Sequence, residues 1–274
     1  MDAFIVVSMS SWVADDFQPG ITTQKLIRNW GMDLPERLGS YDSVSWWMPA
    51  AHAARLQRVG QAKELIAPGP YWLTQIPQSL TQRMVSSSTV EDFLSQAPEN
   101  EFFIKPAEAK IEGFEAAWRN FSQTCEIISE LKIPLGTVLQ WSDKLIDINH
   151  EYRFYVLDGK VVTGSSYLVD GITHYDGADN SKLGEAMEFA QYAVSVIDNQ
   201  PSAYVIDVGI DMSTNSWLVI EGNPAWCSGI YGANPLKVIQ VIERSCNSMD
   251  DDKNYLWTPD AFLNEKAYFK VPLK

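Results

Sequence analysis

The sequence predicts a mixed α+β fold, and two observations lead to this prediction. In the first half of the chain, short apolar runs alternate with segments of helical periodicity, which is typical of strands connected by helices. In the second half, two pairs of apolar runs are each joined by turn-forming residues, which indicates antiparallel hairpins. The 274 residues are 46% hydrophobic and 12% aromatic, so the chain can fold around a sizeable core.

The first third of the chain is expected to form a small α/β unit. Residues 3–8 and 43–49 are apolar runs that predict strands. Residues 21–30, with Thr22 or Thr23 near the cap, and residues 50–66 have the spacing of helices. The segment 67–71 contains two prolines and a glycine, which interrupt helices and strands, and it predicts a boundary between two parts of the fold.

The middle of the chain continues the alternation of strands and helices. Thr89 is a helix N-cap candidate, because a polar residue there precedes an apolar-periodic run. The expected strands lie near 82–87 and at 101–106 and 136–141, and the expected helices lie at 89–97 and 114–132.

The second half of the chain predicts two hairpins. Asp158-Gly159 joins two alternating apolar runs within residues 150–169, and this dipeptide favours a tight turn. Residues 213–215 connect the strands of the second hairpin. Its strands are expected at 203–212 and 216–222, and helices are expected at 181–197 and 234–246.

Charge and cysteine content limit the function classes. The net charge is −14, from 21 basic and 35 acidic residues, which disfavours binding to nucleic acids or anionic membranes, since both are polyanions. The three cysteines are widely spaced and form no disulfide framework. No apolar run reaches the length of a membrane span, and the N-terminus has no signal-peptide pattern. We therefore expect a soluble, cytoplasmic protein.

The second hairpin carries a candidate metal site. Side chains alternate along a strand, so Glu221 and Asn223 share one face, and the short connection brings Asp207 near them. Carboxylate and amide oxygens suit Mg²⁺, which commonly bridges to substrate phosphates. The alternative is that these residues only close a hairpin at the surface.

A polyphosphate bound through Mg²⁺ needs positive charge opposite the metal. Arg153 lies in the first hairpin, on the same strand face as Glu151. Lys105 ends the strand at 101–106, Lys110 follows in the next loop, and Arg83 lies near an earlier strand. For each of these cations alone, the alternative is a solvated surface position.

The loop at 225–235 is a candidate for binding a substrate carboxylate, through Ser228, Gly229 and Tyr231. Its glycines allow close backbone approach, and its N–H groups precede a predicted helix. An ordinary Gly-rich loop is the alternative. Cys227 is expected to be a packed thiol. Four tryptophans either shape the side of a second substrate or pack in the core: Trp12, Trp46, Trp47 and Trp72.

Four segments, taken in order, resemble the ATP-grasp superfamily. FFIKP (102–106) resembles the strand whose lysine contacts nucleotide phosphates, and VLQWS (138–142) resembles the strand that holds adenine by its backbone. HEYRFYVLDGKVV (150–162) resembles the arginine hairpin of glutathione synthetase-like and ribosomal-protein glutamate ligase-like members. YVIDVGIDMSTNSWLVIEGNP (204–224) resembles the terminal metal hairpin. The resemblance covers residues 75–246.

Within that superfamily, the arrangement of Arg83, Lys105 and Lys110 is similar to a clade of bacterial and phage proteins named for one Arg and two Lys. The resemblance implies an ATP-grasp fold, in which two α+β lobes hold ATP between them, preceded by a small N-terminal α/β domain. The implied domains are residues 1–74, the first lobe at 75–138, and the second lobe with a C-terminal tail at 139–274.

The resemblance also implies roles for individual residues. Lys105 and Lys110 would contact the ATP phosphates, supported by Arg83. Arg153 would bind the γ-phosphate and the transition state, so Arg153 and Lys105 are the catalytic candidates. The remaining roles are the adenine hinge at Gln140, Trp141 and Ser142, the ribose hydroxyls at Glu151, and Mg²⁺ at Asp207, Glu221 and Asn223.

Two features depart from the superfamily pattern. The segment after Lys105 contains a single glycine, Gly113, where a Gly-rich flap is usual, so Lys110 is a candidate to replace part of the flap. The segment from Gln140 to Glu151 is long, so the ribose role could instead belong to Asp143 or Asp147.

The implied activity is that of an ATP- and Mg²⁺-dependent carboxylate-amine ligase, which forms an amide or peptide bond through an acylphosphate. Its partners would be small-molecule or peptide carboxylate and amine substrates, without nucleic acid or membrane, and the oligomeric state is left open. An ATP-dependent phosphotransferase and a non-catalytic nucleotide-binding module are the alternatives.

Overall fold

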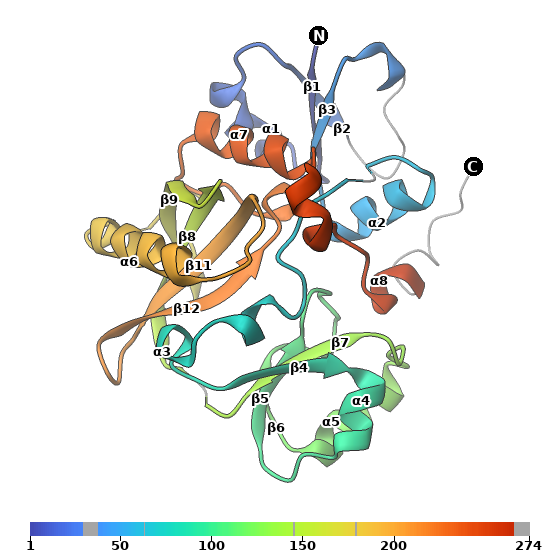
Figure 1. Cartoon of the computed structure of the whole chain (residues 1–274), viewed down its shortest axis with the longest axis vertical. Coiled ribbons are helices and arrows are strands. Elements are labelled where there is room, and N and C mark those ends of the chain that lie inside the picture. The colour runs from blue at the N-terminus through green and yellow to red at the C-terminus, as the bar shows by residue number, and fades with distance from the viewer. Residues whose placement is uncertain (30–37, 63, 145, 179, 266–274) are drawn as a thin grey trace. The chain divides into compact units, whose positions relative to one another are not determined.

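The computed structural model describes residues 1–29, 38–62, 64–144, 146–178 and 180–265 (Figure 1). The fold is mixed α+β, as predicted, and the chain divides into two compact units. The larger unit contains Met1–Pro68 and Ile148–Trp257, and the smaller unit contains Gly69–Asp147 and Thr258–Lys274.

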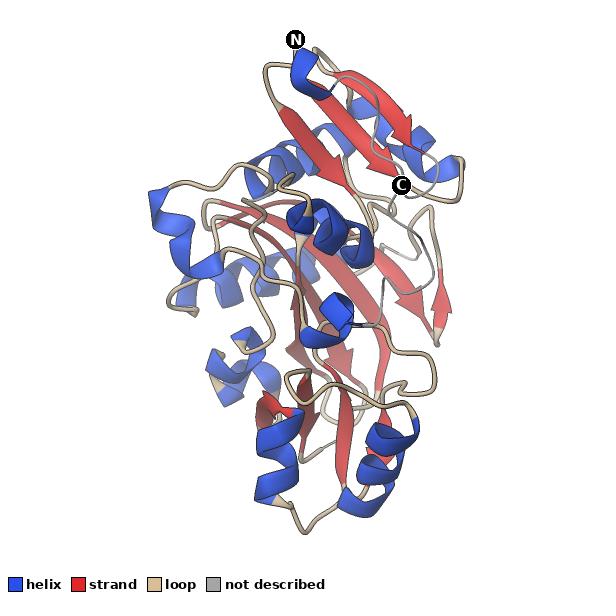
Figure 2. Ribbon diagram, turned by 90° about the vertical axis from the view of Figure 1, so that its right-hand side faces the viewer, coloured by secondary structure: helices blue, strands red, loops and turns tan. Residues whose placement is uncertain are grey.

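A three-stranded parallel sheet forms the N-terminal part of the larger unit. Its order is β2-β1-β3, with β1 at Ala3–Val7, β2 at Lys25–Asn29 and β3 at Val44–Trp47. All residues of β1 are buried, because a central parallel strand is covered on both faces. Helices α1 (Trp12–Phe17) and α2 (Ala50–Arg58) follow β1 and β3, and Figure 2 shows helices beside these strands.

The helix predicted at residues 21–30 is wrong for its described part, because residues 25–29 form β2. Thr22 and Thr23, expected near a helix cap, donate their backbone N–H groups to the Gln24 side-chain oxygen. An isolated helix of this length is marginal, whereas the edge of β1 offers a row of unpaired backbone groups. Trp30 lies outside the described residues.

The helix predicted at 50–66 ends early, at Arg58. Gly60 has φ of +79°, and the N–H of Gln61 donates to the carbonyl of Leu56 at 2.8 Å, which is the bonding of a glycine C-cap. The apolar residues after this cap continued the helical pattern in the sequence. One of them, Ile66, instead forms an isolated antiparallel bridge with Leu256. Residue 63, within the predicted helix, lies outside the described residues.

The rest of the larger unit is a five-stranded antiparallel sheet in the order β10-β9-β8-β11-β12. Its strands are β8 (Ile148–Leu157), β9 (Lys160–Val169), β10 (Ile172–Thr173), β11 (Ala203–Asp211) and β12 (Ser216–Asn223). Both predicted hairpins are therefore confirmed. Asp158 and Gly159 have φ of +46° and +72°, which is the left-handed pair that a two-residue turn requires.

Two helices pack on this sheet, and both were predicted. Helix α6 (Leu183–Val196) covers strands β8, β9, β11 and β12. Helix α7 (Pro235–Ser245) contacts β11 and β8 as well as β3, so it joins the two sheets of the larger unit.

The register of the five-stranded sheet places functional candidates side by side. Asp207 on β11 is the direct partner of Arg153 on β8 and, on its other side, of Glu221 on β12. The register of β11 with β12 shifts immediately after Asp207. All residues of β11 are buried, so Asp207 lies in the centre of the sheet.

The smaller unit is a four-stranded antiparallel sheet in the order β4-β7-β5-β6. Its strands are β4 (Val85–Thr89), β7 (Val138–Ser142), β5 (Phe102–Pro106) and β6 (Ala117–Arg119). Its helices are α3 (Gln78–Thr81), α4 (Val90–Gln96), α5 (Phe121–Glu130) and α8 (Ala261–Glu265). The predicted cap is confirmed, since the Thr89 hydroxyl accepts the backbone N–H of Asp92 at 3.1 Å.

The helix predicted at 114–132 is wrong in its first part. Residues 117–119 form β6, which pairs with β5, and the helix begins only after Asn120. The Asn120 side chain accepts the N–H of Gln123, and the Gln123 side chain accepts the N–H of Asn120. This reciprocal capping box fixes the start of α5 and frees the preceding residues for the sheet.

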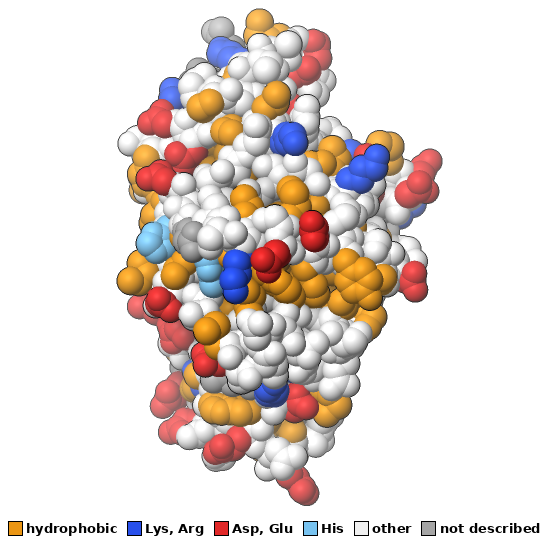
Figure 3. Space-filling view, turned by 90° about the vertical axis from the view of Figure 1, so that its left-hand side faces the viewer, with side chains coloured by type: hydrophobic (Ala, Val, Ile, Leu, Met, Phe, Trp, Pro, Cys, Tyr) orange, Lys and Arg blue, Asp and Glu red, His pale blue; other side chains and the backbone are white. Residues whose placement is uncertain are grey.

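Short 3-10 helices complete the described elements. They are η1 (Gln18–Gly20), η2 (Leu38–Ser40), η3 (Trp72–Gln75), η4 (Ala225–Cys227) and η5 (Asp250–Tyr255). Among the described residues, no helix has the length and apolar character needed to cross a membrane. Acidic side chains outnumber basic ones on the face in Figure 3, in keeping with the net charge of −14.

The predicted division at residues 74/75 and 138/139 stays a prediction. The two compact units divide the chain after Pro68, after Asp147 and after Trp257. Residues 139–147 thus belong to the smaller unit, together with α8 from the C-terminal segment. Residues 266–274 of the predicted tail lie outside the described residues.

We expect His52 to make the protein less stable in mild acid. His52 is buried in α2, and neither ring nitrogen has a hydrogen-bond partner among the described residues. Burial, aided by the nearby charge of Arg55, lowers the pKa of His52 to about 4 from its ordinary value near 6.5. Between about pH 4 and pH 6.5 the unfolded state binds more protons than the folded state, because His52 is protonated only after unfolding. The free energy of unfolding therefore falls as the pH is lowered through this window, by at most about 1.4 kcal/mol per pH unit.

Urea unfolding at pH 7 and pH 5 tests this expectation in wild type and in His52→Leu. The variant should lose less stability than the wild type between the two pH values. His174→Leu, at an exposed position, is the control and should behave like the wild type. An equal loss in wild type and His52→Leu would show that His52 is not responsible.

Candidate active site

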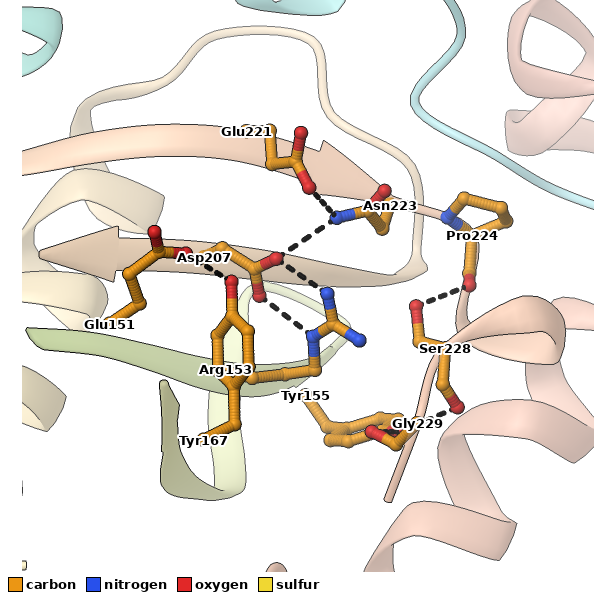
Figure 4. Close-up of polar contacts among 10 residues, drawn as sticks. All are labelled: Glu151, Arg153, Tyr155, Tyr167, Asp207, Glu221, Asn223, Pro224, Ser228 and Gly229. Atoms are coloured by element: carbon orange, nitrogen blue, oxygen red, sulfur yellow. Dashed lines mark hydrogen bonds and ion pairs between the residues drawn. The ribbon is translucent and has the colours of Figure 1, made fainter. Parts of the chain in front are cut away.

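A buried ion pair joins the two central strands of the five-stranded sheet. Arg153 Nε donates to Asp207 Oδ1 at 2.9 Å, and Arg153 Nη2 donates to Asp207 Oδ2 at 2.6 Å (Figure 4). Both side chains are buried, and Asp207 is fully so. The two parallel hydrogen bonds form the bidentate contact that is specific to arginine and carboxylate.

The ion pair keeps Arg153 charged. Burial alone would lower the pKa of the Arg153 guanidinium, but the Asp207 carboxylate outweighs this effect and raises the pKa well above its usual range. Arg153 is therefore a fixed cation at neutral pH. Its Nη1 group has no hydrogen-bond partner among the described residues, so it can donate to a bound anion.

Asn223 and Glu221 extend the cluster from the end of β12. Asn223 Nδ2 donates to Asp207 Oδ2 at 3.0 Å and to Glu221 Oε1 at 2.9 Å. Figure 4 shows the three side chains on one face of the sheet with Arg153. The structure thus brings together Asp207, Glu221 and Asn223, while their metal-binding role stays a prediction.

The donor set of this cluster fits Mg²⁺. It offers two carboxylates and an amide oxygen, which are hard ligands, and Glu221 and Asn223 are only half-buried. Among the described residues, no group of three or more His, Cys, Asp or Glu side chains could hold a metal. A magnesium ion here would accordingly need the Asn223 amide oxygen as well as ligands from water or substrate.

Glu151 lies beside the ion pair and is held by Tyr167. The Tyr167 hydroxyl donates to Glu151 Oε2. Burial raises the pKa of Glu151, and the charges of Asp207 and Glu221 add to this, although the Tyr167 hydrogen bond and Arg153 oppose it. The Tyr167 ring also lies 5.0 Å from the Arg153 guanidinium carbon, within cation–π range.

Tyr155 and Tyr167 are functional candidates that sequence reasoning did not identify. Tyr155 is two residues from Arg153 on β8 and so lies on the same strand face, which the alternation of side chains in the sequence predicts. The position of Tyr167 near Glu151 could not be predicted from the sequence. The register of β8 with β9 shifts between Glu151 and Tyr152, so Tyr167 is the direct partner of neither residue.

Tyr155 forms hydrogen bonds with the backbone of the predicted substrate loop. The Tyr155 hydroxyl lies 3.2 Å from the carbonyl oxygen of Ser228 and 3.0 Å from that of Gly229, and can donate to either. The Ser228 hydroxyl donates to the Pro224 carbonyl at 2.8 Å, so it is engaged within the loop. Tyr231 has φ of +49°, a strained value for a bulky residue, and its ring lies 5.3 Å from the Arg153 guanidinium carbon. Carboxylate binding by Ser228, Gly229 and Tyr231 stays a prediction.

The smaller unit brings together two of the nucleotide-binding candidates. Lys105 on β5 is the direct register partner of Gln140 on β7. Gln140 Nε2 donates to the Ser87 hydroxyl of β4 at 3.4 Å. Lys105 and Gln140 are both half-buried, so they are placed on neighbouring central strands without being enclosed.

The other candidates of the smaller unit are more scattered. The Trp141 ring packs 5.2 Å from the Phe93 ring, in the apolar core. The Ser142 hydroxyl donates to the Lys144 carbonyl at 3.0 Å, and Arg83 Nη1 donates to the Thr81 carbonyl at 3.0 Å. Lys110 is exposed in the segment after β5. The roles assigned to these four residues stay predictions.

Comparison with known proteins gives a family match. The model of an ATP-grasp domain family, family 2 of the clade named for one Arg and two Lys, matches residues 80–241. This range is more than half of the chain and contains every nucleotide- and metal-binding candidate. Among curated proteins, no match is found.

Comparison with solved structures also gives matches. D-cycloserine synthetase DcsG has 13% identity and a TM-score of 0.56, over 90% of this chain and 100% of that chain. D-alanine–D-alanine ligase from Bacillus anthracis complexed with ATP has 10% identity and a TM-score of 0.48, over 90% and 96%. ATP-grasp ligase PsnB complexed with minimal precursor has 12% identity and a TM-score of 0.45, over 88% and 98%. At 13% identity and a TM-score of 0.56, the likeness to D-cycloserine synthetase DcsG is one of fold alone.

Breaking the buried pair should strongly destabilise the protein. Arg153→Met leaves the Asp207 carboxylate buried without its bidentate partner, so we expect the free energy of unfolding to fall by about 3–5 kcal/mol. The double variant with Asp207→Leu should lose less than the sum of the two single variants, because it leaves no unpaired charge. Urea unfolding measures all three values.

The matched control is Arg28→Met, which breaks the exposed pair of Arg28 with Asp15. We expect a loss of about 0–1 kcal/mol there, because solvent screens an exposed ion pair. Equal losses in Arg153→Met and Arg28→Met would contradict a structural role for the buried pair.

Proposed function

We propose, from the premise that this chain belongs to family 2 of the ATP-grasp clade named for one Arg and two Lys, that it is an ATP-dependent ligase joining a carboxylate to an amine. The observation that carries the proposal is the cluster of Arg153, Asp207, Glu221 and Asn223 on one sheet face. A fixed cation beside hard oxygen donors is the arrangement that a transferring phosphoryl group requires.

The proposed reaction has two steps. In the first, a carboxylate oxygen of one substrate attacks the γ-phosphorus of ATP, the bond from that phosphorus to the β–γ bridging oxygen breaks, and ADP leaves. In the second, the amine of the other substrate attacks the carbonyl carbon of the acylphosphate. A carbon–nitrogen bond forms, inorganic phosphate leaves, and the amine loses a proton to solvent.

Arg153 would stabilise the transferring phosphoryl group. Its Nε and Nη2 donors are used by Asp207, which fixes the plane of the guanidinium, and Nη1 remains for a phosphate oxygen. Because the guanidinium is already oriented and already desolvated, little reorganisation is needed when charge develops. Together with Lys105, it is our candidate for the catalytic cations.

Asp207, Glu221 and Asn223 would hold Mg²⁺, which when bound neutralises phosphate charge. Glu221 and Asn223 are the more accessible of the three, whereas Asp207 already accepts hydrogen bonds from Arg153 and Asn223. We therefore assign Glu221 the principal metal contact. Glu151, oriented by Tyr167, is our candidate for the ribose hydroxyls.

We propose the nucleotide contacts of the smaller unit from the strand pairing of its sheet. Lys105 would bind the ATP phosphates, with Lys110 and Arg83 in support. Residues 139–142 of β7 are paired on both sides, by β4 and β5. Their backbone groups thus face neighbouring strands, which favours side chains, Gln140 in particular, over the backbone for any adenine contact within β7.

We predict that Glu221→Ala abolishes turnover and preserves the fold. ADP release should fall about a hundredfold or more relative to wild type, because the accessible carboxylate of the cluster is lost. The assay measures ADP release with pooled carboxylates, pooled amines and both together, in the presence of MgCl₂. Thermal unfolding checks that the variant is folded. Glu188→Ala, an exposed carboxylate on α6, is the matched control and should keep wild-type activity.

The same assay separates the alternatives. A ligase turns over ATP repeatedly only when carboxylate and amine are both present, because with the carboxylate alone it stops after the ADP that accompanies acylphosphate formation. A phosphotransferase releases ADP with an alcohol acceptor, and a nucleotide-binding module releases none. Wild-type rates in a folded Glu221→Ala variant would exclude the proposed role of the cluster.

A further inference from the structure

A small aromatic cavity lies beside the substrate loop, entirely within the larger unit. Its volume is about 170 Å³, and its side-chain walls include five aromatic rings and one carboxylate. They are Trp12, Phe17, Trp47, Tyr175, Tyr231 and Asp16. At roughly 30 Å³ for each water-sized group, the cavity has room for about five to six heavy atoms.

The rings form a floor and a rim. Phe17 is fully buried and packs 5.9 Å from the Trp47 ring, so these two form the inner part. Trp12 and Tyr175 are 46% and 58% exposed and lie 5.0 Å apart, edge to face, at the opening. The cavity is therefore open to a ligand from solvent. The buried Trp46 and Trp72 belong to the core instead.

One wall is shared with the candidate active site. Tyr231 stacks on Tyr167 at 4.9 Å, and both rings lie within cation–π distance of Arg153. The indole N–H of Trp47 donates to the Ser228 carbonyl at 2.6 Å, which ties the opposite wall to the same loop. The Tyr231 ring thus faces both the cavity and the Arg153 guanidinium.

Two of the loop segments that bear the walls are in close backbone contact. A Cβ added to Gly232 would come within 2.9 Å of the Asp176 carbonyl oxygen, so the segment bearing Tyr175 lies directly against the segment bearing Tyr231. A Cβ on Gly229 would come within 3.0 Å of the Tyr231 ring. Gly232 is therefore required for this packing, because a backbone oxygen fills the place of its Cβ.

Charge decides which ligand fits. Asp16 has no cationic partner among the described residues, and Asp176 and Asp15 lie near enough to act on it with the same sign of charge. Burial and these acidic neighbours raise the pKa of Asp16. A neutral or anionic ligand would leave this repulsion in place, whereas a cation would relieve it. Aromatic rings around a carboxylate are also the surroundings that favour ammonium and guanidinium groups.

We propose that this cavity binds a cationic side chain, ammonium or guanidinium in type, of one of the two ligase substrates. The inference rests on the proposed function for the identity of the ligand as a substrate. The cavity itself requires no nucleotide, so it can be tested by direct binding.

The experiment titrates the full-length protein with n-butylammonium chloride and with 1-butanol, which has the same length without the charge. The indole N–H signals in ¹⁵N-labelled protein report binding, because Trp12 and Trp47 line the cavity. We expect n-butylammonium to bind about tenfold more tightly than 1-butanol. Equal affinities would overturn the proposal in favour of an apolar cavity.

Two variants with one matched control localise the effect. Asp16→Asn should remove the preference for the cation, and Trp12→Leu should weaken n-butylammonium binding several-fold at an exposed position that tolerates change. Asp15→Asn removes a carboxylate that pairs with Arg28 outside the cavity, and it should keep the preference. An equal loss of the preference for n-butylammonium in Asp15→Asn and Asp16→Asn would show that the overall negative charge of the region, and not Asp16 in the cavity, causes the preference. That result would overturn the proposal.

ADP release separates this inference from the proposed function. ADP release with neutral substrates, combined with no selective binding of n-butylammonium, would overturn the cavity assignment and leave the ligase proposal intact. Charge-selective binding that depends on Asp16, combined with no ADP release from any substrate pair, would support the cavity and count against the ligase.

Discussion

The contact between Arg153 and Asp207 is the constraint on which the site depends. Two charges at the centre of a sheet are tolerated only when each satisfies the other with good geometry, because an unpaired buried charge costs several kcal/mol. The bidentate contact requires Arg153 and Asp207 to be direct partners across β8 and β11, and the observed register supplies this. The ion pair therefore links the pairing of the sheet to the orientation of the guanidinium.

The neighbours of this pair are arranged by the same charges. Tyr167 and Tyr231 stack together and place their rings near the guanidinium, while Asn223 links the buried carboxylate of Asp207 to the accessible carboxylate of Glu221. The result is a gradient on one face from a buried, fixed cation to half-buried oxygen donors. In a chain with a net charge of −14, this fixed cation is what makes the face suitable for a polyphosphate.

Two of the errors of the sequence-based prediction share one physical cause, whereas the early end of α2 has a different one, its glycine C-cap. Residues 25–29 and 117–119 were both assigned to helices, and both are short edge strands. Their local pattern is weak, so the backbone groups of a neighbouring strand decide their structure. The signal for the second error was present, because Asn120 and Gln123 have the spacing of a capping box. No comparable signal marked β2, whose pairing with β1 is a tertiary contact.

The sequence by itself determined the α+β class, the two hairpins, and the presence of Arg153, Asp207, Glu221 and Asn223 on them. Alternation and turn chemistry are local properties, and they suffice to place these side chains on strand faces. Only the tertiary structure decided that β8 lies beside β11, that a register shift brings Tyr167 to Glu151, and that Trp12, Asp16 and Tyr231 surround one cavity. These outcomes depend on pairing and packing between residues far apart in the chain, which local periodicity does not encode.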